Sequence, residues 1–69
     1  DYSGISNTHN SLGVIYSKLY NQKLALKHFL LSYEYANIQQ ASAEHLVVIL
    51  LNIGISHQSL KNYTEAERY

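Results

Sequence analysis

The feature that most restricts the fold is a repeat of residue chemistry at an offset of 41 residues. Four pairs are identical at this offset: Gly13 with Gly54, Leu19 with Leu60, Asn21 with Asn62, and Ala25 with Ala66. Apolar residues also align with one another, as in Ile5 with Leu46, Leu12 with Ile53, and Val14 with Ile55. Self-similarity at such a period indicates stacked structural units, each of which buries its apolar face against its neighbours.

The repeated residues also follow the period of a helix, in alternating steps of three and four positions. The first candidate core stripe consists of Ile5, His9, Leu12, Tyr16 and Leu19. Its counterpart in the second unit consists of Leu46, Leu50, Ile53, His57 and Leu60. Between them, a third stripe consists of Ala25, His28, Phe29, Ser32, Tyr35 and Ala36. We therefore expect an all-α fold of antiparallel helical hairpins.

The expected helices cover about residues 3–19, 22–39 and 43–60. Turns are expected at Tyr20-Asn21, at 40–42 and at Lys61-Asn62, and the last turn opens a fourth, truncated helix. Asn21, Ser42 and Asn62 stand where an N-cap is needed, because their side chains accept hydrogen bonds from free first-turn amides. This organisation predicts a first unit over residues 1–41 and an incomplete second unit over residues 42–69.

One segment also suits a strand. Residues 46–51 (Leu-Val-Val-Ile-Leu-Leu) are continuously apolar and include β-branched residues, as in a buried strand. About 18 residues separate the two flanking turns, however, and no glycine or proline interrupts the apolar run. Length therefore favours a helix that is covered on several sides.

Charge and composition exclude several classes of function. Five basic and five acidic residues balance, and the lysines and the arginine do not form the basic stripe of a nucleic-acid binder. The longest apolar run is too short to span a membrane, which takes roughly 20 residues. No signal peptide is visible, so a cytoplasmic location is expected. A chain of 69 residues without cysteine has little core and no disulfide, so its stability is expected to depend on neighbouring repeats or chains.

The first unit resembles the tetratricopeptide repeat, whose signature runs W-x2-L-G-x2-Y, A-x3-F and then P. Here the corresponding residues are His9, Leu12, Gly13, Tyr16, Ala25 and Phe29, with Asn37 where the proline stands. The second unit matches less well, with Leu50, Ile53, Gly54, His57 and Ala66. Glycine is unfavourable inside a helix, but at positions 13 and 54 its lack of a side chain would let a second helix approach closely. The period of 41 exceeds the usual 34 by about two helical turns, which resembles the lengthened repeats of bacterial signalling and regulatory proteins.

The resemblance implies a right-handed solenoid of about 1.7 repeats that binds a protein or peptide in a groove lined by the first helix of each unit. By helical phase, the expected groove residues are Asn7, Asn10, Val14, Lys18, Val48, Leu51, Ile55 and Ser59. In this hypothesis the asparagines bond a peptide backbone and the apolar residues hold an apolar side chain. The same positions equally suit ordinary packing between repeats.

No motif in the sequence indicates catalysis or a bound cofactor. The four histidines lack the i, i+4 spacing of a helical zinc site, and His9, His28 and His57 fall on the core stripes. The expected function is a non-catalytic protein-binding scaffold segment, without nucleic acid or membrane partners. Two alternatives stay open. One is self-association through exposed repeat ends, and the other is a regulatory segment attached to a sensor kinase or a DNA-binding domain elsewhere in the parent chain.

Overall fold

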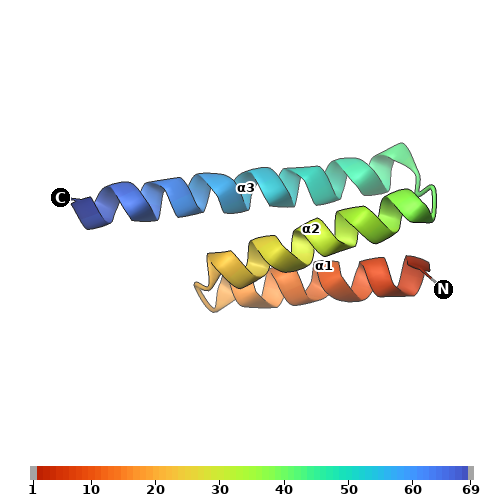
Figure 1. Cartoon of the computed structure of the whole chain (residues 1–69), viewed down its shortest axis with the longest axis horizontal. Helices are drawn as coiled ribbons and strands as arrows, with labels where there is room; N and C mark the ends of the chain where they lie inside the picture. Colours follow the sequence, from red (N-terminus) through yellow and green to blue (C-terminus); the bar gives the residue numbers. More distant parts are fainter. Residues whose placement is uncertain (1, 69) are drawn as a thin grey trace.

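The computed structural model describes the backbone of residues 2–68 and the side chains of residues 2–62. It contains three α-helices: α1 (Tyr2–Lys18), α2 (Gln22–Ile38) and α3 (Ala43–Arg68). α2 runs antiparallel to α1, and α3 returns on the other side of α2, parallel to α1 (Figure 1). The all-α prediction is confirmed, and the first two helices differ from the expected ranges by one residue at most at each end. Residues 46–51 are helical, as their length indicated.

The two turns have the same construction. Tyr20 and Gln40 both adopt a left-handed backbone conformation, with φ of 61° and 58°. The next residue then donates its N–H five positions back, from Asn21 to Tyr16 O and from Ala41 to Ala36 O, at 2.9 Å each. Such closure satisfies carbonyl groups that a helix end leaves free. The predicted N-caps at Asn21 and Ser42 are confirmed, because their side-chain oxygens each accept a first-turn N–H at 3.3 Å.

The expected turn at Lys61-Asn62 is not formed. α3 continues through both residues to Arg68, so Asn62 caps no helix and the expected fourth helix is absent from the described residues. Residues 61–68 contain neither glycine nor proline to stop the helix. A left-handed turn residue also has a conformational cost, and packing of the helix that follows must offset it.

The core lies along α2, which packs against both other helices. Its predicted stripe is confirmed at Ala25, Phe29, Ser32 and Ala36, which are all buried. The predicted α1 stripe is wrong at its ends, since Ile5 and Leu19 are 39% and 67% exposed. Ser6 and Gly13 are the buried residues of α1 instead.

The predicted stripe of α3 is wrong at two of its five positions, because Leu46, Ile53 and Leu60 are half-buried and only the other two are exposed. Ile49 and Ser56 are buried, whereas Leu50 and His57 are exposed. α3 is therefore turned from the expected orientation by less than one residue step of about 100°, so that Ile49 and Ser56 join the buried side. α3 packs mainly on α2 and also contacts α1 through the hydrogen bond between Asn52 and Asn10.

Small residues bring α1 and α2 close together. The hydroxyl of Ser6 donates to the carbonyl oxygen of Ser32, and the hydroxyl of Ser32 donates to the carbonyl oxygen of Ser6, both at 2.8 Å. A Cβ added at Gly13 would lie 2.5 Å from the Phe29 ring, so the close approach expected of this glycine is confirmed. The same expectation fails for Gly54, where an added Cβ meets nothing within 4 Å.

Candidate binding groove between α1 and α3

A hollow of about 260 Å³ opens where the three helices meet. α1 contributes Val14, Ser17 and Lys18 to its lining, and α3 contributes Asn52, Ile55 and Ser56. Phe29 of α2 forms the base, where its ring is 3% exposed. We name this hollow the α1/α3 groove. It exists because α1 and α3 flank α2 on either side and run in the same direction (Figure 1).

Two asparagines join the helices that border the groove. Asn52 donates from its side-chain nitrogen to the side-chain oxygen of Asn10 at 3.1 Å, and both residues are half-buried. Amide groups of this kind have further donor and acceptor capacity beyond one bond. The pair therefore connects α1 to α3 and also leaves polar groups beside the hollow.

The structure brings only some of the eight expected groove residues together. Val14, Lys18 and Ile55 line the α1/α3 groove, with Asn10 beside it. Asn7 lines a different hollow near the second turn, together with His45. Ser59 lines a third hollow, next to the first turn.

The two remaining expected residues, Val48 and Leu51, are 51% and 61% exposed and line none of these hollows. Helical phase alone placed all eight residues on one face of the first helix in each unit. It did not anticipate that Asn10 would bond to Asn52, because that bond depends on how the two helices are placed side by side.

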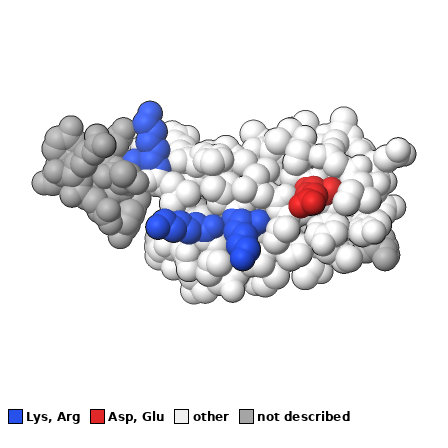
Figure 2. Space-filling model, in the orientation of Figure 1, with Lys and Arg blue, Asp and Glu red and all other residues white. Residues whose placement is uncertain are grey.

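The α1/α3 groove is apolar with one cation at its border. Val14 and Ile55 are 37% and 57% exposed, so a partner side chain has access to both. Lys18 is exposed at the end of α1. Charge is also sparse elsewhere, since most of the face of the molecule drawn in Figure 2 is uncharged. The chemistry suits an apolar side chain next to a carbonyl or carboxylate group.

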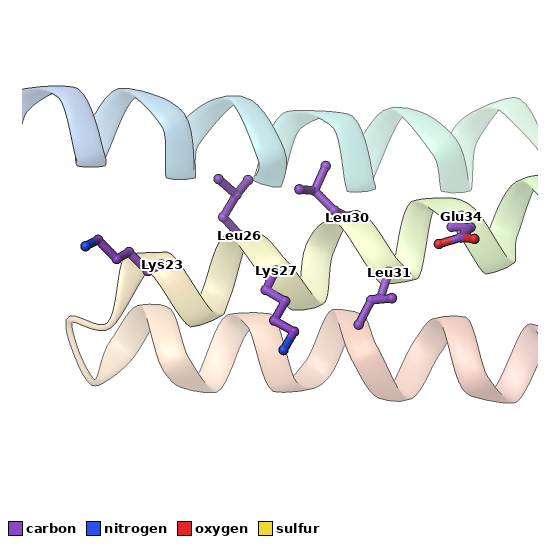
Figure 3. A pocket seen from close by; sticks show the side chains of 6 residues that line it. All are labelled: Lys23, Leu26, Lys27, Leu30, Leu31 and Glu34. Carbon is purple, nitrogen blue, oxygen red and sulfur yellow. The ribbon is translucent and has the colours of Figure 1, made fainter.

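A second, shallower hollow lies on α2. It is lined by Lys23, Leu26, Lys27, Leu30, Leu31 and Glu34. Figure 3 shows Leu26 and Leu30 extending on the side of α3, and Lys27 and Leu31 extending on the side of α1. All of these residues belong to one helix, and the hollow is more open to solvent than the groove that three helices enclose.

Five rings alternate between α1 and α2 in a stacked series that we name the ring ladder. In order these rings belong to Tyr2, Tyr35, His9, His28 and Tyr16. Successive ring centroids lie 5.7, 5.9, 5.2 and 5.4 Å apart, within the range of aromatic pairing. The sequence signal for the ladder is a seven-residue step, which relates Tyr2 to His9 and His9 to Tyr16. The spacing of histidines within single helices gives no sign of the ladder, because its rings alternate between two helices.

His9 and His28 are hydrogen-bonded at the centre of the ladder. Their Nδ1 atoms lie 3.0 Å apart, so one nitrogen must donate a proton while the other accepts it. Burial lowers the pKa of His28, and positive charge on His9 and on Lys27 lowers it further. The placement of histidines on core stripes is confirmed for this pair, which is half-buried, but it is wrong for His57, which is exposed. Among residues 2–62, no three His, Cys, Asp or Glu side chains gather as metal ligands would.

The histidine pair predicts that the chain loses stability in mild acid. A lowered pKa means that folded His28 binds a proton less readily than unfolded His28, so its contribution is present above about pH 6.5 and is lost as the pH falls below that value. Double protonation also breaks the Nδ1 bond, which is worth about 0.5–1.5 kcal/mol. We expect the thermal midpoint to be level from pH 8 to 7 and to fall between pH 6.5 and 5.

Two variants separate this effect from general acid destabilisation. His28→Phe retains a ring in the ladder and removes the titrating group, so the fall between pH 6.5 and 5 should become shallower. His57→Gln removes an exposed histidine of α3 and should leave the profile unchanged. A profile that is the same in all three proteins would contradict the role of the pair.

Among the described helices, none has both the length and the apolar character needed to cross a bilayer. Comparison of the chain with protein-family models, with curated proteins and with solved structures gave no match.

Proposed function

We propose that this chain is a tetratricopeptide-type repeat segment that binds a peptide or protein segment in the α1/α3 groove, without catalysis. The observation that carries the proposal is the position of Val14 and Ile55, which are 41 residues apart and line the same hollow. Two repeat units thus supply equivalent apolar residues to one site. A solenoid that binds in this way presents the first helix of each unit to its partner, and in this proposal α1 and α3 are those helices.

The expected ligand is an extended or helical segment with one apolar side chain. That side chain would occupy the space between Val14 and Ile55, above the Phe29 ring. The amides of Asn10 and Asn52 would bond to the ligand backbone. Lys18 would attract a carboxylate, but a single exposed cation adds little affinity. We therefore expect modest binding that depends mainly on the apolar contact.

A library of displayed peptides, selected against the complete chain, would test this proposal. The selected peptide should shift the amide resonances of Asn10, Val14, Asn52 and Ile55. Ile55→Asp places a charge in the groove and should weaken binding by about tenfold or more. Leu30→Asp is the matched control, because Leu30 is 47% exposed but lies on α2, outside the groove. Shifts that cluster around Leu30 and Lys27 would place binding on α2 and contradict the proposal.

Self-association is the second candidate, and it is favoured by one specific observation. Five large apolar side chains of α3 are 47–61% exposed: Val47, Val48, Leu50, Leu51 and Ile55. Exposed apolar surface of this kind often marks an interface. Light scattering over a hundredfold range of concentration would distinguish the two candidates. A constant monomer mass favours the peptide-binding segment, whereas a dimer that Leu51→Ser dissociates favours assembly.

A further inference from the structure

The His9–His28 pair lies directly beside the α1/α3 groove. On α1, Asn10 follows His9 in the sequence and accepts the hydrogen bond from Asn52 of α3 at 3.1 Å. On α2, Phe29 follows His28 and forms the base of the groove. Each histidine is therefore the sequence neighbour of a residue that borders or forms the groove, so a movement at the pair also moves the groove.

The two histidine rings are nearly parallel, and their Nδ1 atoms face each other. The ring planes differ by 21°, the centroids lie 5.2 Å apart and the Nδ1 atoms lie 3.0 Å apart. The centroid distance exceeds the nitrogen distance by the radii of the two rings, so both Nδ1 atoms lie in the gap between the rings. A gap of this length holds one hydrogen in a bond, and it is too short for a hydrogen on each nitrogen.

The protonation states of the pair differ in this bond. The neutral pair has one N–H between the rings, on either histidine. A pair with one added proton keeps that N–H and bonds more strongly, because a charged donor faces a neutral acceptor. A pair with two added protons has an N–H on each Nδ1 atom and two like charges, so the bond is lost and the rings repel each other. Only the second proton therefore pushes α1 and α2 apart.

The groups around the pair do not neutralise a second charge. Tyr16 of α1 and Tyr35 of α2 face the histidines through their rings, and tyrosine is uncharged near neutral pH. Lys27 of α2 extends on the side of α1 (Figure 3). Burial, the charge of His9 and the charge of Lys27, in this order, lower the pKa of His28. Within residues 2–62, no interaction of the pair involves a carboxylate or α3.

Separation of α1 from α2 at the pair would alter two contacts of the groove. The Phe29 ring fits so closely against Gly13 that an added Cβ would lie 2.5 Å from it, and this contact requires the two helices to stay close. Asn10 would move with α1, whereas Asn52 belongs to α3, which packs mainly on α2. The base of the groove and the bond between its bordering helices would therefore change together.

We propose that protonation of both histidines of this pair opens the α1/α3 groove and releases a bound peptide. The inference rests on the proposed function of that groove and adds regulation by pH to it. Because the second proton is required, the groove stays intact at neutral pH and opens below about pH 6.5, the usual midpoint of a histidine. Binding and protonation are reciprocal, so a bound peptide also makes the second proton harder to add.

The first test needs no peptide. Nuclear magnetic resonance follows the side-chain amide of Asn52 and the histidine rings of the complete chain from pH 7.5 to 5. The Asn52 amide should shift with the second titration of the pair, while circular dichroism shows that the chain is still helical. His28→Phe should abolish this shift and His57→Gln should not, since His57 is exposed on α3. An Asn52 amide that stays unchanged as the pair takes its second proton would overturn the proposal. So would a shift that occurs only when all helix is lost.

The second test uses the peptide selected from the displayed library. One pH unit below the second titration, its affinity for the chain should be about tenfold weaker, because only the fraction of chains with an intact pair binds. This fall should be absent or much smaller in His28→Phe, and a titrating group on the peptide would affect both proteins equally. An equal fall in both proteins would overturn the proposal. If no peptide binds at pH 7.5, the proposed function fails, whereas the Asn52 amide still decides whether the pair acts on the groove.

Discussion

Replacing Phe29 with alanine should lower the free energy of unfolding by about 3 to 5 kcal/mol, which is the usual cost of removing a buried aromatic side chain. The ring is 3% exposed, fits against Gly13 of α1 and forms the base of the α1/α3 groove, so its loss affects all three helices. A chain of 69 residues has a total stability of roughly 3 to 10 kcal/mol. Urea titration followed by circular dichroism should therefore find a much lower unfolding midpoint for the variant, and no folded baseline at 25 °C if the unsubstituted chain lies at the lower end of that range.

A double-mutant cycle with Gly13 tests the reason for that loss. Gly13→Ala alone should destabilise the chain, because overpacking against the ring costs about 1–3 kcal/mol and exceeds the gain of about 1 kcal/mol in helix propensity. In a Phe29→Leu background the flat ring is gone, and the same substitution should cost less or become stabilising. Gly54→Ala is the matched control and should stabilise the chain by about 1 kcal/mol in either background, because nothing lies within 4 Å of its added Cβ. Additive effects of Gly13→Ala and Phe29→Leu would contradict a direct ring contact.

The parts of this fold that the sequence predicts well depend on local chemistry. The helix starts after Asn21 and Ser42 were predictable, because each cap bonds an amide only three residues away. The stripe of α2 was also predictable, because this helix is covered by α1 on one side and by α3 on the other. A helix with neighbours on two sides has apolar or small residues on both covered faces. The spacing of these residues in the sequence therefore predicts both faces.

The parts that sequence reasoning missed depend on the placement of one helix against another. Within residues 46–51 every side chain is apolar, so no period distinguishes the buried Ile49 from its exposed neighbours. The His9–His28 bond and the Asn10–Asn52 bond each join residues from different helices, and a shift of one residue in packing would break both. The candidate groove was predictable only for residues near the meeting point of three helices. Asn7 and Ser59 lie too far along their helices to reach it.

Replacing Ile49 with alanine should cost about 2 to 5 kcal/mol and should release α3 from α2. Ile49 is the largest side chain that is fully buried among the described residues, at 0% exposure, and Ser56 is the other buried residue on the same face of α3. Most of the apolar side chains around it face away from α2, so few contacts can replace the lost ones. Hydrogen exchange should then show that α3 loses protection while the α1–α2 hairpin, joined by the two serine hydrogen bonds and the ring ladder, retains more of its own.

The neighbouring residue provides the control for Ile49. Val48→Ala removes apolar atoms from an adjacent position that is 51% exposed, and should change stability by no more than about 0.5 kcal/mol, as surface substitutions usually do. Ile49→Val, which removes a single methylene, should fall between the two at about 0.5–1.5 kcal/mol. The loss of stability should therefore be largest for Ile49→Ala and smallest for Val48→Ala. This order is expected only if α3 packs on α2 in the observed orientation. If Val48→Ala proved as costly as Ile49→Ala, α3 would be turned by about 100° relative to α2, which would contradict the observed packing.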